Sequence, residues 1–170
     1  MPGFLEAFRP GARTPRLRDV DIQDLLAQGR DSVLLDLDNT MLPWKDSHLP
    51  EETVVWIEEA KAAGLKVCIV SNTHYPRRLA QIAEQIEVPY VSRALKPRPY
   101  GFLKALDVLS TVPERAVVIG DQVLTDVWGG NRAGIFTILV DPLHPREFVG
   151  TKVSRLIERG ILCLLKRDAD

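Results

Sequence analysis

The chain has 170 residues, of which 45% are hydrophobic and 26% charged, and its formal net charge is −1. Domains typically run to about 100 to 200 residues, so we expect one domain over residues 1–170, with enough apolar material for a core. The two cysteines, Cys68 and Cys163, make no disulfide framework, and no apolar run approaches the roughly 18 residues of a membrane span. Together with the lack of a signal peptide's apolar core, these features favour a cytoplasmic protein.

The charges are unevenly distributed. Residues 1–18 contain four arginines against one acid, and residues 144–167 contain six basic residues against two acids, so two basic ends flank an acidic body. We interpret the basic N-terminal arm, residues 1–18, in one of two ways. It packs on the domain, or its aromatic residues Phe4 and Phe8 and its arginines contact an anionic surface, such as the inner face of a membrane.

Hydrophobic periodicity predicts strands and helices that alternate along the chain. Helices are expected at residues 19–29, 50–63, 77–87, 100–109, 125–133 and 147–166, with the fifth interrupted by Gly129 and Gly130. Strands are expected at residues 33–35, 65–70, 88–91, 115–119 and 136–140. Most of these strands are apolar throughout, which is typical of a parallel sheet with helices on both faces.

Polar side chains follow three of the apolar runs directly. They are Asp36, Asp38 and Thr40 after the first strand, Ser71 and Asn72 after the second, and Asp121 and Asp126 after the fourth. Ligands of open parallel sheets bind beyond the carboxyl ends of the strands, so we expect these residues to meet in one crevice. Asp36 and Asp38 start on the same face of an extended chain, and a divalent cation with oxygen ligands is the usual way to offset their repulsion.

Four short motifs occur in order, each at a strand end or in the turn that follows. They are Asp36-Leu37-Asp38-Asn39-Thr40, Ser71-Asn72, Lys96-Pro97, and Gly120-Asp121-Gln122 with Thr125-Asp126. This set resembles the four motifs of haloacid dehalogenase-like (HAD) phosphohydrolases. With the alternating elements, the resemblance implies a three-layer α/β fold of the Rossmannoid type, with a mainly parallel five-stranded sheet.

Further matches resemble the YqeG-type subgroup (subfamily IIIA), which is related to phosphatidylglycerophosphate phosphatases. They are the overall length and the pairs or triplets Leu42-Pro43-Trp44, Thr151-Lys152, Ser154-Arg155 and Glu158-Arg159. Family members often insert a cap domain after the first motif or between the second and third. Residues 40–65 and 72–96 leave no room for one, so we expect a capless, open site, or one that takes its lid from a second copy of the chain.

The resemblance implies a role for each acid of the site. Asp36 would be the nucleophile that forms an aspartyl-phosphate, and Asp38 would protonate the leaving oxygen and then deprotonate the attacking water. Mg²⁺ would be held by a carboxylate oxygen of Asp36, the backbone carbonyl of Asp38 and the side chain of Asp121, with Asp126 in support. A structural calcium loop is a poor alternative, because the EF-hand glycine and glutamate positions are occupied by Met41 and Ser47.

The same resemblance assigns groups to the phosphate. Lys96 would offset the charge on the phosphoryl oxygens, and Ser71 would act beside it in catalysis, with Asn72 and Thr40 donating neutral hydrogen bonds. His74 and Arg77, with Arg78 beside them, follow the second motif. They would bind a second phosphate of the substrate, or they form only the cap and first turn of a helix.

Three functions remain open from the sequence. The first is hydrolysis of a phosphomonoester, with phosphatidylglycerophosphate at a membrane surface as the substrate that the subgroup suggests. The second is a nucleotide or nucleic-acid-end phosphatase, although no aromatic platform for stacking bases is evident. The third is a binding or scaffold protein of the same fold, which would have no need for so costly a cluster of charges.

Overall fold

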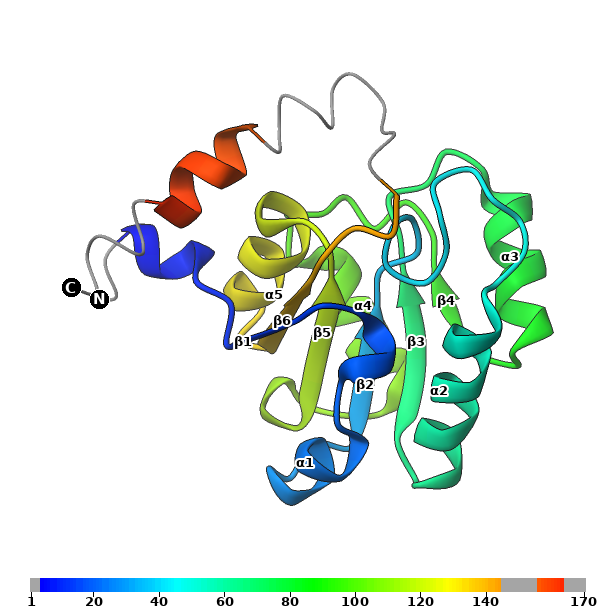
Figure 1. The fold of residues 1–170 in the computed structure, drawn as a ribbon. Helices are drawn as coiled ribbons and strands as arrows, with labels where there is room; N and C mark the ends of the chain where they lie inside the picture. The colour runs from blue at the N-terminus through cyan, green and yellow to red at the C-terminus, as the bar shows by residue number, and fades with distance from the viewer. Residues whose placement is uncertain (1–3, 145–155, 164–170) are drawn as a thin grey trace.

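The computed structural model describes residues 4–144 and 156–163. Six parallel strands form one sheet in the order β1-β6-β5-β2-β3-β4 (Figure 1). The strands are β1 (Ala12–Thr14), β2 (Ser32–Leu35), β3 (Lys66–Val70), β4 (Tyr90–Val91), β5 (Ala116–Gly120) and β6 (Phe136–Val140). The predicted parallel sheet is confirmed, and its central strands β2 and β5 are buried along their whole length.

The sheet has one strand more than the five we predicted. The additional strand, β1, pairs in parallel with β6 at the edge of the sheet. Its three residues, Ala12, Arg13 and Thr14, are half-buried or exposed and contain no apolar run. A pattern of buried apolar residues cannot reveal such a strand, because only its pairing with β6 defines it.

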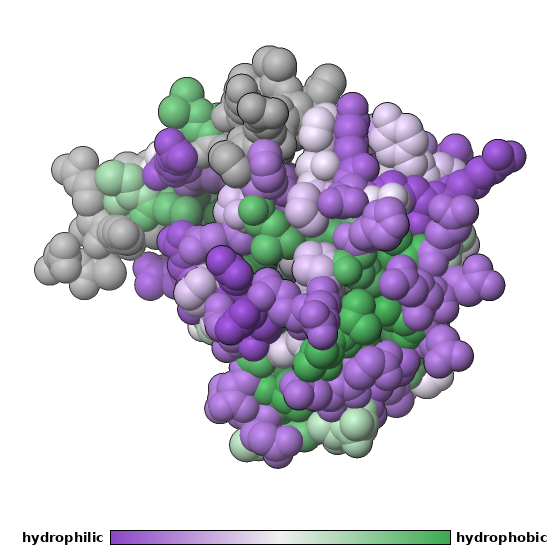
Figure 2. Space-filling model, turned by 45° about the vertical axis from the view of Figure 1, so that its right-hand side comes forward, coloured by the Kyte–Doolittle hydropathy of each residue, from purple (hydrophilic) through white to green (hydrophobic). Residues whose placement is uncertain are grey.

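Helices cover both faces of the sheet (Figure 1). One face carries α1 (Ile22–Ala27), α2 (Glu51–Ala62) and α3 (Pro76–Gln85), and the other carries α4 (Tyr100–Leu109) and α5 (Trp128–Arg132). Alternate side chains of β2 separate the two cores, since Val33 and Leu35 pack with the first group and Leu34 with the second. In Figure 2, polar residues cover most of the surface on the side of α2 and α3, with a broken apolar band between them.

No cap domain interrupts the described chain at the two places considered above. The segment between β2 and β3 contains a loop and α2, and the segment between β3 and α4 contains α3 and the two-residue strand β4. The prediction of a capless fold is therefore confirmed. The carboxyl ends of the strands stay accessible between the loops that follow β2 and β3.

The helix predicted at residues 125–133 is irregular at a different place from the one we expected. A π-helical turn, η4, covers Val123–Val127, and α5 continues regularly through Gly129 and Gly130. The two glycines do not break the helix. Their lack of a side chain lets it pack closely on its neighbours. A Cβ on Gly129 would lie 2.6 Å from the Phe102 ring, and one on Gly130 would lie 2.6 Å from the Thr137 methyl group.

The N-terminal arm packs on the domain. Its 3₁₀-helix η1 (Phe4–Phe8) buries Phe8 against Trp128, with 5.1 Å between the ring centroids. The helix of residues 156–163 lies beside η1 (Figure 1), and Ile161 and Leu162 join the same apolar cluster. This helix confirms part of the helix predicted at 147–166, whose remaining residues lie outside the described ranges.

The arginines of the arm contact acids of their own chain. Arg13 pairs with Asp141 at 2.8 Å and Arg18 with Glu52 at 2.8 Å. Water screens these surface pairs, so they contribute little to stability. Their geometry and the burial of Phe8 agree with the packed interpretation of the arm. Within residues 4–144 and 156–163, no helix combines the length and apolarity that crossing a membrane requires.

Candidate active site

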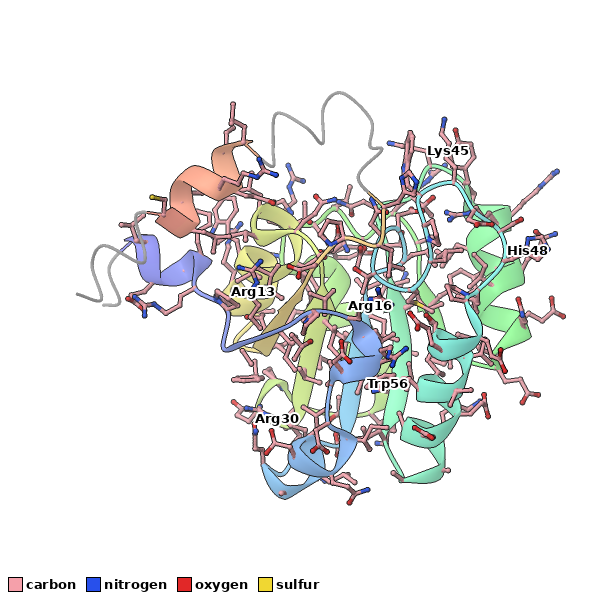
Figure 3. All side chains as sticks on the ribbon, in the orientation of Figure 1. Arg13, Arg16, Arg30, Lys45, His48 and Trp56 are labelled. Carbon is pink, nitrogen blue, oxygen red and sulfur yellow. The ribbon has the colours of Figure 1, made fainter. Side chains whose placement is uncertain are left out.

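A cleft of about 420 Å³ opens at the carboxyl edge of the sheet. The strand register pairs Leu35 with both Ile69 and Ile119, so the segments after β2, β3 and β5 leave the sheet at one level. Seven residues predicted from the sequence line the cleft, namely Asp36, Asp38, Ser71, Asn72, His74, Arg78 and Lys96. Lys45 and His48, in the loop after β2, project at this end of the molecule, whereas Arg30 lies at the opposite end (Figure 3).

Lys96 forms the centre of the charged cluster. Its Nζ lies 2.5 Å from Asp36 Oδ1 and 2.7 Å from Asp126 Oδ1, and its side chain is only 3% exposed. Asp126 is also buried, and its Oδ2 accepts a hydrogen bond from the backbone N–H of Gln122. The lysine therefore holds together the carboxylate after β2 and the carboxylate of η4, which are 90 residues apart in the chain.

Three carboxylates gather at this point. One oxygen from each of Asp36, Asp121 and Asp126 lies within 4.8 Å of the others. Thr40 Oγ1 lies 3.3 Å from Asp36 Oδ2 and 3.2 Å from Asp121 Oδ1, and its single proton serves one of them at a time. Three acids against one lysine leave an excess of negative charge, and an all-oxygen set of this kind fits a divalent cation such as Mg²⁺.

Burial and charge set the protonation of the cluster. Burial, and then the neighbouring charge of Asp36, raise the pKa of Asp126 from 3.8 to about 7, although Lys96 opposes this shift. Burial alone would lower the pKa of Lys96, but the charges of Asp126 and Asp36 together raise it above its ordinary value. Lys96 therefore stays charged at neutral pH, whereas the Asp126 carboxylate takes up a proton near pH 7.

Asp38 turns toward a different cation from the one that Asp36 contacts. Strand β2 ends at Leu35, and the chain turns at Asn39 with a φ of 63°, so the same-face rule for residues two apart no longer applies. Asp38 Oδ1 lies 2.8 Å from Arg78 NH1, on the first turn of α3. Burial raises the pKa of Asp38, with Arg78 opposing and Asp36 adding to the shift.

Asn72 and Ser71 shape the loops around the cleft. The carboxamide of Asn72 bonds the backbone of Lys96 twice, donating to its carbonyl at 2.9 Å and accepting from its N–H at 2.9 Å. Ser71 Oγ accepts a hydrogen bond from the Thr73 N–H at 3.0 Å and keeps its own proton to donate. Asn72 therefore positions Lys96, whereas Ser71 presents a donor to the cleft.

The structure separates the two neighbouring arginines of α3. The sequence suggested both for a second phosphate, but Arg77 is exposed and lies outside the cleft lining, whereas Arg78 lines the cleft beside His74. Helical spacing could have indicated this, because Arg78 is four residues before the buried Ile82 and so lies on the inward side. Trp44 and Tyr75, which the sequence places near the crevice, line the cleft, and Lys45 lines it as well without having been predicted.

Gly120 makes room for the acid of η4. A Cβ at this position would lie 2.3 Å from Asp126 Cγ and 2.4 Å from Asp126 Oδ2. The glycine of the fourth motif is needed here because the Asp126 carboxylate packs directly on the backbone at the end of β5.

Comparison with known proteins agrees with this geometry. A family model for haloacid dehalogenase-like hydrolases matches residues 3–134. The chain is 37% identical over 160 residues to "Probable phosphatase YqeG" of Bacillus subtilis, and the matched region covers 94% of this chain and 92% of that protein. It is 29% identical over 175 residues to "Phosphatidylglycerophosphate phosphatase 1, chloroplastic/mitochondrial" of Arabidopsis thaliana, with 93% of this chain and 47% of that protein covered.

Solved structures share the fold at low identity. An uncharacterized protein from Listeria monocytogenes serotype 4b superposes with a TM-score of 0.56 at 21% identity, over 69% of this chain and 84% of that one. At this identity the solved structure shows only that the fold is shared, whereas the sequence relatives show the family. Because the family model spans most of the chain and a relative matches along nearly its whole length, the chain belongs to the haloacid dehalogenase-like hydrolases, and the resemblance to phosphatases of this family is confirmed.

Proposed function

We propose that the chain is a Mg²⁺-dependent phosphomonoesterase that works through an aspartyl-phosphate on Asp36. The observation that carries the proposal is the placement of the Asp36 carboxylate. It lines the cleft, touches Lys96 at 2.5 Å and lies within 4.8 Å of the carboxylates of Asp121 and Asp126. A carboxylate nucleophile held beside a buried cation and further acids suits attack on an anionic phosphoryl group.

In the first step, an Asp36 oxygen forms a bond to phosphorus as the bond from phosphorus to the ester oxygen breaks. Asp38 gives its proton to the departing oxygen, so an alcohol leaves. In the second step, Asp38 takes a proton from water, the water oxygen bonds to phosphorus, and the bond from phosphorus to Asp36 breaks to release phosphate. Asp38 lines the same cleft, and burial raises its pKa, which favours a residue that both gives and takes a proton.

Lys96 and the carboxylate cluster have separate tasks in this scheme. Lys96 keeps its charge and orients Asp36, and it offsets negative charge that develops on the phosphoryl oxygens. Asp36 and Asp121 would hold the metal with the backbone carbonyl of Asp38, and Asp126 would support the site. When bound, Mg²⁺ supplies a positive charge that draws the phosphate dianion to a carboxylate.

The proposed substrate is phosphatidylglycerophosphate at a membrane surface. Two relatives carry the name phosphatidylglycerophosphate phosphatase, and the chain is 29% identical to each and covers 47% and 59% of their lengths. The capless cleft supports this choice, because its opening is not closed by a second domain within the described residues. Trp44 and Tyr75 at the cleft add amphipathic rings of the kind found at membrane interfaces.

The test measures phosphate release from an aryl phosphate and from phosphatidylglycerophosphate in vesicles, with Mg²⁺ or with a chelator. We expect release to need Mg²⁺ and Asp36→Asn to lower kcat by at least about 10³-fold, because the amide is not a nucleophile. Asp107→Asn is the matched control, because Asp107 is an exposed acid of α4.

Three outcomes would contradict parts of the proposal. Activity that survives Asp36→Asn would rule out this nucleophile, and full activity in chelator would rule out the metal. A preference for 3′-phosphorylated oligonucleotides over the lipid would contradict the proposed substrate but not the proposed reaction.

A further inference from the structure

Arg78 occupies a place in the cleft that the proposed reaction does not use. Its guanidinium reaches inward from the first turn of α3 and contacts Asp38 Oδ1 through NH1 at 2.8 Å. Its Nε donates to the backbone carbonyl of Asp46 at 2.6 Å, which ties it to the loop after β2. The side chain is 14% exposed, so a full positive charge is held largely away from water.

The guanidinium has donor capacity to spare. Among the described residues, NH2 of Arg78 is buried and has no hydrogen-bond partner. A buried charged donor without a partner has lost its hydrogen bonds to water and gained none in return, so the position is unfavourable unless something binds there. A guanidinium group can donate two parallel hydrogen bonds to two oxygens of one phosphate, so a phosphate-type anion is the partner that suits Arg78 best.

The position of Arg78 relative to the two aspartates decides which part of a substrate would reach it. Lys96 is held by Asp36 and Asp126, so its charge serves the phosphoryl group that is transferred. Arg78 is held by Asp38, the group that faces the leaving oxygen in the proposed reaction. A ligand of Arg78 is therefore a part of the leaving alcohol.

The distance between an anion on Arg78 and the leaving oxygen is limited by Asp38, which lies between them. Asp38 acts on the leaving oxygen at hydrogen-bond distance and Arg78 binds Asp38 at hydrogen-bond distance, so an anion on Arg78 lies within roughly 8 Å of the leaving oxygen. A three-carbon alcohol with a second phosphate fits that span. Lys45 and His74 line the same cleft and add basic groups to it.

We propose that Arg78 forms a second anion subsite, an inference that rests on the proposed function. The substrates are then phosphomonoesters whose leaving alcohol carries another phosphate-type anion a few bonds away. The second anion binds the free donors of the guanidinium and competes with Asp38 for NH1. Asp38 Oδ1 is then released to turn toward the leaving oxygen. The subsite thus selects the leaving group and completes the alignment of the acid.

The experiment compares two soluble substrates that differ in the second anion. Glycerol 3-phosphate lacks it, and the deacylated headgroup of phosphatidylglycerophosphate carries a phosphodiester beside the phosphomonoester. We expect the wild-type chain to favour the second substrate in kcat/KM and Arg78→Gln to reduce that preference by about 10- to 100-fold, as for loss of a charged hydrogen bond. Arg78→Lys keeps the charge but not the paired donors, and should recover only part of the preference.

Arg93→Asn is the matched control. Arg93 is exposed and follows β4 at the same edge of the sheet, and asparagine tolerates its φ of 49°. Vesicles that contain phosphatidylglycerophosphate form a separate arm. Equal dependence on Arg78 with vesicles and with the soluble headgroup assigns recognition to the anion, whereas dependence with vesicles alone assigns it to the lipid surface and overturns the subsite.

A binding measurement makes the result independent of turnover. Calorimetry of glycerophosphoglycerol, which carries only the phosphodiester, should show binding to Asp36→Asn. Binding to the double variant Asp36→Asn with Arg78→Gln should be at least about 10-fold weaker, because a charged hydrogen bond is lost. The proposal fails if Arg78→Gln lowers kcat/KM equally for both soluble substrates and leaves this binding intact. It also fails if Arg77→Gln, and not Arg78→Gln, removes the preference. If no phosphomonoester is hydrolysed, the proposed function fails, and the calorimetry still decides the subsite.

Discussion

Replacing Lys96 by methionine tests the charged cluster most directly. Methionine fills a similar space without a charge, so the variant leaves Asp36 and Asp126 in place and removes their shared cation. Opposite charges at the observed 2.5 and 2.7 Å attract by about 6 kcal/mol per pair at an effective dielectric constant of 20. Desolvation offsets much of this, and removing one partner of a buried pair typically costs about 3–5 kcal/mol.

The cost depends on pH in a defined direction. Because the pKa of Asp126 is raised from 3.8 to about 7, the folded protein holds a proton that the unfolded chain has lost, and stability falls as pH rises through this interval. Without Lys96, which lowers this pKa, the pKa of Asp126 rises further. Lys96→Met should therefore be most destabilising near pH 8 and less so near pH 6, where Asp126 is neutral.

Urea and thermal unfolding in chelator at the two pH values measure this effect. At pH 8 we expect a loss of about 3–5 kcal/mol, equivalent to a fall in Tm of about 6–20 °C for a chain of this size. Adding Asp126→Asn to Lys96→Met should recover about 1–3 kcal/mol. Lys104→Met, on the exposed side of α4, is the control. A Lys96→Met protein that unfolds like wild type at pH 8, or a double variant no more stable than the single one, would refute the reasoning.

Three further predictions concern other parts of the chain. Gly120→Ala places a Cβ 2.3 Å from Asp126 Cγ, so kcat should fall at least about 10-fold, as when a catalytic geometry shifts by an ångström, and a normal rate would contradict the close packing. Burial favours the neutral form of Asp31, but hydrogen bonds from two hydroxyls and a nearby arginine lower its pKa overall. Asp31→Asn should therefore cost about 1–2 kcal/mol at pH 7, and the gap to wild type should close as pH falls below about 4, as followed by unfolding from pH 7 to 3. The buried Glu158 accepts a hydrogen bond from the Leu124 N–H at 3.0 Å, so Glu158→Ala should cost about 1.5–3 kcal/mol, and an unchanged Tm would show that the helix of residues 156–163 does not hold η4.

Much of the architecture could be predicted because it follows from local patterns. Strands such as β2 and β5 are apolar throughout, and the helices between them repeat apolar residues at helical spacing, so their order implied a parallel sheet covered on both faces. The sequence did not predict the edge strand β1, because only its pairing with β6 defines it. It also did not predict the π-helical turn η4, which accompanies the packing of Asp126 against Gly120.

The same division applies to the site. The amino-acid sequence by itself determined which residues stand at the carboxyl ends of β2, β3 and β5, because parallel strands in register bring their ends to one edge. Only the tertiary structure decided that Lys96 joins Asp36 to Asp126, and that Arg78 rather than Arg77 reaches Asp38. These contacts link residues from loops and helices far apart in the chain. Their distances depend on how the layers pack, and no local pattern encodes that.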